Sequence, residues 1–86
     1  MAYSILLAPP AERQLKAFSQ AVQKRLVKRL KRLQANPRPQ GVKKLVGGGD
    51  LYRVREGDYR IIYTIRDKAL IVLVLKFGDR KEVYRS

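Results

Sequence analysis

Three arginines in the second half of the chain have the type and spacing to bind an anion together. Arg53 and Arg55 lie in one segment of alternating polar and apolar residues, and Arg60 lies in the next. Such alternation predicts β-strands, and the intervening Glu56-Gly57-Asp58 is typical of a tight turn. If the turn places Arg55 opposite Arg60, all three arginines lie on one face of a hairpin. Like charges on neighbouring strands repel each other, so we expect an anion among them.

The other face of this hairpin is apolar. Four residues alternate with the arginines along the two segments: Tyr52, Val54, Ile61 and Tyr63. A slip of one residue would bury the arginines and expose these side chains, so hydrophobic burial fixes the register. The sequence therefore predicts a hairpin that is buried on one face and cationic on the other.

The charge of the whole chain also indicates an anionic partner. The 86 residues include 20 Lys and Arg but only 7 Asp and Glu, which gives a net charge of +13. Such a field attracts polyanions and speeds encounter with them, whereas solubility alone is served by a mixed-sign surface. We expect nucleic acid or an RNA-rich particle as partner, with an acidic protein or a membrane surface as the alternatives. An acidic protein that masks the free chain is a further expectation.

The composition excludes several classes of site. The chain has no cysteine and no histidine, which rules out disulfides, thiolate metal sites and histidine-based catalysis, and with so few acids we expect no metal and no cofactor. No apolar run approaches the roughly 18 residues of a membrane span, and the N-terminal segment lacks the basic region of a signal peptide. We therefore expect a cytoplasmic protein with no membrane partner, in which residues 1–86 form a single domain.

Two helices are predicted in the first half of the chain. Pro9 and Pro10 end an apolar strand over Tyr3–Leu7 and are suited to the first turn of a helix. Ser19 is a suitable N-cap for a second, longer helix, which Asn36-Pro37 ends. The apolar stripe of that second helix comprises Val22, Leu26, Leu30 and Leu33, widened by Val27.

The remaining segments complete a sheet. Residues 40–50 are expected to be a flexible connection, and the apolar run 69–75 predicts a strand buried on both faces. The element order predicts an α+β domain: a small antiparallel sheet in the order β-α-α-β-β-β, with the two N-terminal helices packed on one face. The arginines of the hairpin would then lie on the uncovered face.

The second helix also carries cations on all its other faces. They are Lys24, Arg25, Lys28, Arg29, Lys31 and Arg32, with no acid among them. Either this is a solvated face whose long stems cover apolar surface, or it contacts RNA phosphates without reading sequence. The glycine triplet 47–49 is not followed by the Lys-Ser/Thr of a nucleotide-binding loop.

The second half of the chain resembles the RelE toxins of bacterial toxin–antitoxin pairs, within the wider RelE/ParE superfamily. The resemblance rests on Leu51-Tyr52-Arg53-Val54-Arg55, on Gly57-Asp58-Tyr59-Arg60 and, after the apolar strand, on 78–80 and Glu82-Val83-Tyr84. It implies the toxin of a type II pair: a metal-independent, ribosome-dependent endoribonuclease that cleaves mRNA in the A site by attack of the ribose 2′-OH. It also implies a cognate antitoxin that holds the toxin inactive in a hetero-oligomer.

The resemblance implies catalytic roles for Arg55, Arg60, Arg80 and Tyr84. Arg55 would lower the pKa of the 2′-OH and hold the phosphate, Arg60 and Arg80 would stabilise the developing charge, and Tyr84 would stack on a base, transfer a proton, or both. Candidate phosphate-binding residues are Arg53, Lys43, Lys44, Lys76 and Lys81. Several relatives have lysine where this chain has Arg53 and Arg55. Arginine does not lose its proton, so the identity of the general base stays open. Only two residues follow Tyr84, so the C-terminal helix of some relatives is expected to be absent.

Two alternative functions remain from the sequence. The ParE branch of the superfamily acts on DNA gyrase without cutting nucleic acid, and it generally lacks the catalytic set. A noncatalytic RNA-binding or ribosome-associated module would use the same arginines only to bind phosphate. Taken singly, each site residue also has a structural explanation: Arg60 as the partner of an acid such as Asp58, Tyr84 as an aromatic cover of the sheet edge, and the other arginines as exposed cations.

Overall fold

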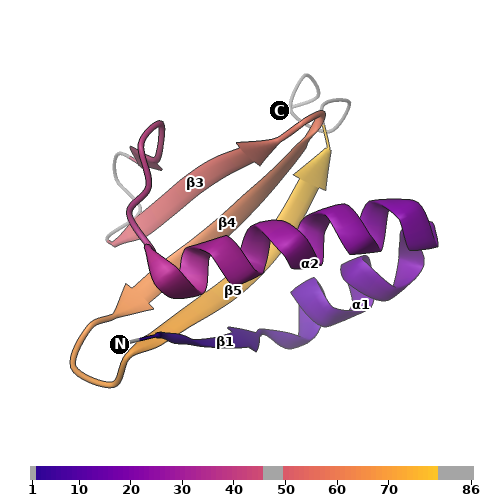
Figure 1. Ribbon diagram of the computed structural model, residues 1–86. Helices are drawn as coiled ribbons and strands as arrows, with labels where there is room; N and C mark the ends of the chain where they lie inside the picture. Colours follow the sequence, from indigo (N-terminus) through magenta and orange to yellow (C-terminus); the bar gives the residue numbers. More distant parts are fainter. Residues whose placement is uncertain (1, 46–49, 80–86) are drawn as a thin grey trace.

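In the residues that the computed structural model describes, 2–45 and 50–79, two helices pack on one face of a five-stranded sheet (Figure 1). The sheet has the strand order β1-β5-β4-β3-β2. The elements are β1 (Ser4–Leu7), α1 (Pro9–Ala17), α2 (Gln20–Ala35), β2 (Lys43–Lys44), β3 (Leu51–Glu56), β4 (Tyr59–Arg66) and β5 (Ile71–Asp79). The α+β class and the two helices on one face are as the sequence predicts.

The sheet is mixed, whereas the sequence predicts an antiparallel one. β1 pairs parallel with β5, with Ile5 opposite Val72, and the other strand pairs are antiparallel. The connection over 40–50 also contains a strand, because Lys43 and Lys44 pair with β3. The sheet therefore has one more strand than the sequence predicts.

β5 is not buried on both faces, and that prediction is wrong. Val72 and Val74 are buried, but the alternating Ile71 and Leu73 are only partly buried, because the helices cover just one face. The strand begins at Ile71, after Leu70 takes a left-handed conformation with φ 55°. It continues past the predicted end to Asp79.

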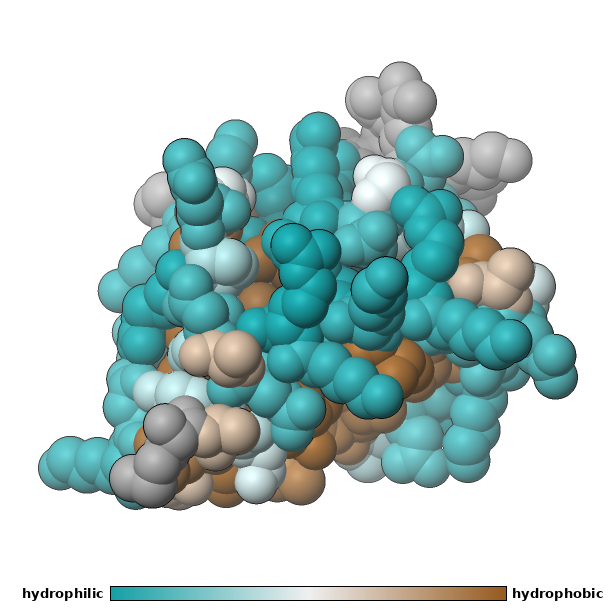
Figure 2. Space-filling model, in the orientation of Figure 1, coloured by the Kyte–Doolittle hydropathy of each residue, from teal (hydrophilic) through white to brown (hydrophobic). Residues whose placement is uncertain are grey.

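The helix ends follow the capping residues. Pro9 and Pro10 occupy the first turn of α1, and the Ser19 Oγ accepts a hydrogen bond of 3.3 Å from the Val22 N–H at the start of α2. Leu26, Leu30 and Leu33 are buried as predicted, but Val27 is 38% exposed. Successive helical residues are about 100° apart, so Val27 falls outside the stripe that its neighbour Leu26 belongs to. Figure 2 shows this helix-bearing face, where hydrophilic side chains cover most of the surface.

A buried tyrosine joins the sheet to the end of α2. The Tyr63 side chain is fully buried, and its hydroxyl donates a hydrogen bond of 2.7 Å to the Pro37 carbonyl. Burial raises the pKa of Tyr63 to about 12, so the hydroxyl stays protonated at neutral pH. Tyr52 stacks on Tyr63 with ring centroids 5.9 Å apart, and the Arg38 guanidinium lies over Tyr52. These contacts hold the loop after α2 against β3 and β4.

A polar cluster at the β4–β5 turn makes the stability of the folded protein depend on pH. The two terminal guanidinium nitrogens of Arg38, Nη1 and Nη2, donate to the Asp67 carboxylate at 3.0 and 2.9 Å, and the Tyr3 hydroxyl donates to it at 2.8 Å. These bonds lower the pKa of Asp67 to about 2. Because this value lies below the unfolded value of about 4, the contribution to stability is complete above pH 4 and is lost as the pH falls toward 2.

We expect Asp67→Asn to lower the melting temperature at pH 6, because the amide cannot form the bidentate ion pair with Arg38. The difference from the unsubstituted protein should narrow as the pH falls from about 4 to about 2, where about half of the native carboxylate is itself protonated. Thermal unfolding followed by circular dichroism across this range measures the difference. A gap that stays constant down to pH 2 would contradict this account.

Candidate nucleic-acid interface

The β3–β4 hairpin has the predicted register. Arg55 lies opposite Arg60, and Val54 lies opposite Ile61, so the predicted pairing is confirmed. Gly57 has φ 61° and is followed by a residue of negative φ, as in a type II′ turn, whose twist suits a two-residue hairpin. Hydrophobic burial and turn chemistry thus select the same pairing.

The hydrogen-bond alternation of β3 brings the Arg55 and Arg60 side chains close together. The Leu45 N–H donates to the Leu51 carbonyl at 2.8 Å, so Leu51, and by alternation Arg53 and Arg55, direct their backbone groups toward β2. Arg55 and Arg60 consequently form a non-hydrogen-bonded pair between β3 and β4. Side chains approach more closely in such pairs than in hydrogen-bonded ones.

Two rows of opposed residues carry cations on the face that the helices leave uncovered. Residues directly opposite on neighbouring strands share a face of the sheet. One row runs Lys43, Arg53, Ile62 and Lys76, and the next runs Arg55, Arg60 and Gly78. We call the five cations of these rows the cationic face: Lys43, Arg53, Arg55, Arg60 and Lys76.

Arg53 and Arg60 are partly buried, whereas the other three members of the cationic face are exposed. Arg60 also has a hydrogen-bond donor without a partner among the described residues. The side chain is partly buried, and its Nη1 is buried without a hydrogen-bond partner among the described residues. Gly78, opposite Arg60 on β5, places no side chain beside it. A buried donor without a partner costs free energy, and an oxygen of a bound phosphate would satisfy it.

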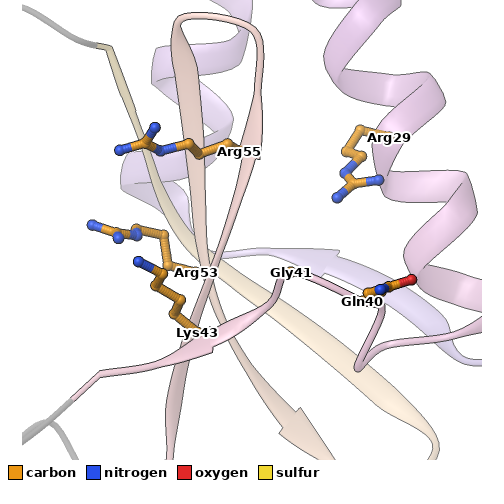
Figure 3. A pocket seen from close by; sticks show the side chains of 6 residues that line it. All are labelled: Arg29, Gln40, Gly41, Lys43, Arg53 and Arg55. Atoms are coloured by element: carbon orange, nitrogen blue, oxygen red, sulfur yellow. The ribbon is translucent and has the colours of Figure 1, made fainter.

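The open edge of β3 forms a cleft against α2. It has a volume of about 200 Å³ and is lined by Arg29, Gln40, Gly41, Lys43, Arg53 and Arg55. In Figure 3 the Arg29 side chain reaches from α2 toward the hairpin, whereas Arg53 and Arg55 extend from β3 toward the cationic face. The cleft therefore adjoins the cationic face around the edge of the sheet.

The sequence did not single out Arg29 among the cations of the second helix. The signal was present, because Arg29 lies three residues after Leu26 and four before Leu33, both of which are buried. Residues at these spacings lie on the same side of a helix, so Arg29 borders the buried stripe. Gln40 had no signal in the sequence, since it lies in the connection expected to be flexible.

The predicted phosphate-binding residues do not all lie together. Lys43 and Lys76 join the arginines, but Lys44 lies opposite Tyr52, whose ring packs on the helix side of the sheet. The Lys44 Nζ is instead 3.6 Å from the Asp50 carboxylate. Arg80, Lys81 and Tyr84 lie outside the described residues.

Arg25 shows the structural use of one α2 cation. Its guanidinium is 3.6 Å from the Glu56 carboxylate and occupies the space that a side chain at position 57 would need. With φ 61°, Gly57 also has a conformation that other residues rarely adopt. Arg25 therefore braces the hairpin turn next to Arg55 and Arg60.

Residues 2–45 and 50–79 contain no candidate for a metal site or for a membrane-spanning helix. No three His, Cys, Asp or Glu side chains in this part of the chain gather as metal ligands. None of the helices described here is long and apolar enough to cross a membrane. The site consists of cations and of the backbone and amide groups beside them.

We expect Arg55→Gln to stabilise the free protein, by about 0.2–1 kcal/mol, because it removes the repulsion between two arginines that are directly opposed. Urea denaturation at low ionic strength measures the change. Arg66→Gln is the matched control: Arg66 is an exposed strand cation too, but it lies opposite Ile71, so the control should change stability less. Destabilisation by Arg55→Gln would show that the pair is not repulsive.

Comparisons with known proteins agree on one family. The family model described as the ParE toxin of the type II toxin–antitoxin system, parDE, matches residues 5–84. The mRNA interferase toxin RelE of Escherichia coli strain K12 is 31% identical over 88 residues, which cover 98% of this chain and 92% of that protein.

Solved structures of similar fold include two RelE toxins. The archaeal RelE–RelB complex from Pyrococcus horikoshii OT3 has a TM-score of 0.80 at 33% identity, covering 93% of this chain and 97% of that one. The isolated RelE toxin of E. coli has a TM-score of 0.79 at 29% identity, covering 96% and 92% of the two chains. Each match spans nearly the whole chain, so the similarity concerns the complete fold.

Proposed function

Because the chain belongs to the RelE/ParE family of type II toxins, we propose that it is an endoribonuclease that cleaves mRNA in the ribosomal A site and thereby inhibits translation. The observation that carries this proposal is the opposed pair of Arg55 and Arg60 within the cationic face. Such a pair is unfavourable without an anion and favourable around a phosphate. The E. coli relative is named an mRNA interferase, which supports the same activity.

The proposed reaction is attack of the ribose 2′-oxygen on the adjacent phosphate. It leaves a 2′,3′-cyclic phosphate and releases a 5′-hydroxyl. The 2′-OH must lose a proton, the phosphorus centre must carry extra negative charge, and the leaving oxygen must gain a proton. Cations held ready at the phosphate stabilise that charge without reorganising, so we propose that no metal is required.

We assign roles on the cationic face by position. Arg55 holds the phosphate and lowers the pKa of the 2′-OH, and Arg60, whose Nη1 lacks a partner among the described residues, stabilises the charge of the transition state. Arg80 is proposed to share the second role, and Tyr84 to stack on a base or transfer a proton. Since arginine keeps its proton, neither Arg53 nor Arg55 is the general base.

We further propose a cognate antitoxin as partner, in a toxin–antitoxin hetero-oligomer in the cytoplasm. The archaeal relative was solved as a RelE–RelB complex. The net charge of +13 on a chain of this size would make the free protein bind RNA indiscriminately, which a masking partner prevents. We propose that residues 1–86 act as a single domain.

Primer extension on mRNA in programmed ribosomes tests the activity. We expect discrete cuts in the A site that require the ribosome, that persist in EDTA, and that are absent with naked mRNA. Tyr84→Phe in the same assay tests the proton-transfer role, because it removes the hydroxyl and keeps the ring. A folded protein that binds ribosomes but produces no cut would refute the proposal.

The ParE function is the second candidate, because the matching family model is described as a ParE toxin. Such a toxin would inhibit DNA gyrase and leave mRNA intact. A supercoiling assay with purified gyrase separates the two functions. Inhibition of gyrase without ribosome-dependent cleavage would establish the ParE function for this chain.

A further inference from the structure

The edge of β3 is open where β2 ends. β2 pairs with β3 through Lys43 and Lys44, and on the N-terminal side of β2 the paired segment stops before Gly41, whose φ is 89°. The register would place Gly41 opposite Arg55 if β2 continued. By the alternation along β3, the Arg55 N–H points toward this open edge. Among the described residues no strand pairs with this edge at Arg55, so the edge offers the Arg55 N–H as a hydrogen-bond donor.

Arg29 supplies a guanidinium to the same place from the opposite side. Its side chain is partly buried, because it borders the stripe of Leu26 and Leu33. Its Nε is buried and has no hydrogen-bond partner among the described residues. A charged group held in this way calls for a ligand or water to complete its bonding.

No acid is among the described residues that line the cleft between these groups, and Arg29 is the cation that reaches into it from α2. Its lining comprises Arg29, Gln40, Gly41, Lys43, Arg53 and Arg55, around about 200 Å³ (Figure 3). At about 30 Å³ per water, this space holds several waters or a phosphate group. Arg25, one helical turn away, differs because Glu56 pairs with it.

We propose that this cleft is a second phosphate subsite, which binds the RNA backbone at a phosphate next to the one held on the cationic face. The inference rests on the proposed function for the identity of the RNA, but the binding itself does not require cleavage. Arg29 contributes the guanidinium, Gln40 an amide donor, and Arg55 its backbone N–H. The subsite adds affinity and fixes the path of the strand around the sheet edge.

The shared lining favours RNA over an acidic protein as the occupant. Arg53 and Arg55 line the cleft from β3 while their side chains extend to the cationic face. RNA carries a phosphate at every nucleotide, so one strand can occupy the cleft and the cationic face in succession. The planar guanidinium fork also matches two oxygens of a phosphate.

The test is the salt dependence of binding to a short single-stranded RNA, 2′-O-methylated so that the attacking hydroxyl is blocked. Fluorescence anisotropy gives the association constant between about 50 and 300 mM salt, a range over which loss of counterion-releasing contacts is measurable. Arg29→Met should weaken binding about tenfold and reduce the slope of log K against log salt by about 0.7, the value for one phosphate contact on a single strand. Lys28→Met removes the same charge from an exposed neighbouring position and should leave the slope almost unchanged.

Two further variants separate the subsite from a loss of folding. Arg29→Lys keeps the charge and should retain the slope. Gln40→Ala removes no charge and should weaken binding a few fold at an unchanged slope. Equal effects of Arg29→Met and Lys28→Met, or no effect of either, would overturn the subsite. Polyglutamate is added as a competitor to represent an acidic protein. If polyglutamate binding depends on Arg29 and RNA binding does not, the cleft is assigned to an acidic protein instead.

The cleavage assay distinguishes failure of this inference from failure of the proposed function. In programmed ribosomes, Arg29→Met should raise the concentration of protein needed for half-maximal cleavage and leave the single-turnover rate at saturation within about twofold, since it loses binding that is equal in ground and transition states. A fall in the saturated rate would contradict a binding role. If the unsubstituted protein does not cleave at all, the proposed function fails, and the anisotropy slopes still decide the subsite.

Discussion

Arg60→Ala should reduce the rate of mRNA cleavage in programmed ribosomes by about 10²–10³-fold, the typical loss when one preorganised charge-stabilising donor is removed. The reason lies in its setting: Arg60 faces Arg55 across the hairpin and holds a buried Nη1 that has no partner among the described residues. The phosphate is the group that can satisfy this nitrogen. Because the charge on that phosphate grows in the transition state, the loss should fall mainly on the rate at saturation.

Single-turnover cleavage at saturating toxin measures this rate, and the half-saturating concentration should change much less. Arg66→Ala is the control, since Arg66 is an exposed cation at the other end of the same strand and should change the rate less than about threefold. Circular dichroism establishes that both variants are folded. A loss by Arg60→Ala that disappears at high toxin concentration would make Arg60 a binding residue and leave catalysis to other groups.

The hairpin could be predicted from the sequence because its information is local. Tyr52 and Val54 alternate with the arginines over a few residues, and one slip would invert every side chain. Gly57 adds an independent constraint, because the turn needs a positive φ. The helix boundaries are local in the same sense, since Ser19 and Pro37 act on adjacent backbone groups.

The parallel pairing of β1 with β5 could not be predicted in this way. It joins Ser4 to Ile71, far apart in the sequence, and an apolar strand carries no sign of its partner's direction. The burial of β5 was misjudged for a related reason. A continuous apolar run is typical of a strand covered on both faces, but Leu73 here lies beside the half-exposed Leu6 on the face without helices.

The site shows the same division between local and long-range information. The arginines of the cationic face follow from strand alternation, but the cleft depends on where β2 leaves β3, which nothing in residues 40–50 indicates beyond the presence of Gly41. Arg80 and Tyr84 rest on the resemblance of the sequence to the RelE toxins. Their roles are therefore tested by substitution rather than by geometry.

Phe77→Ala should destabilise the protein by about 3–5 kcal/mol, as expected for truncation of a buried aromatic residue. Phe77 is 1% exposed, lies opposite Ile61, and packs edge-on against Phe18 with ring centroids 6.3 Å apart. Its N–H also donates to the Gln14 Oε1 at 2.8 Å, so the strand is tied to α1 at this residue. A small domain has about 5–15 kcal/mol of stability in total, so this loss would leave a large unfolded fraction.

Phe77→Ala should also weaken mRNA cleavage, because it displaces residues of the cationic face. Phe77 separates Lys76 of the cationic face from Gly78, which lies opposite Arg60, so loosening it disturbs both rows of the site. Urea denaturation measures the stability, and Leu6→Ala is the control, because Leu6 is 49% exposed at the sheet edge and should cost about 1 kcal/mol or less. Saturating phosphate or RNA should recover part of the Phe77→Ala loss, because a ligand that binds only the folded state stabilises it. Equal costs for the two substitutions would show that the core is not centred where β5 meets α1.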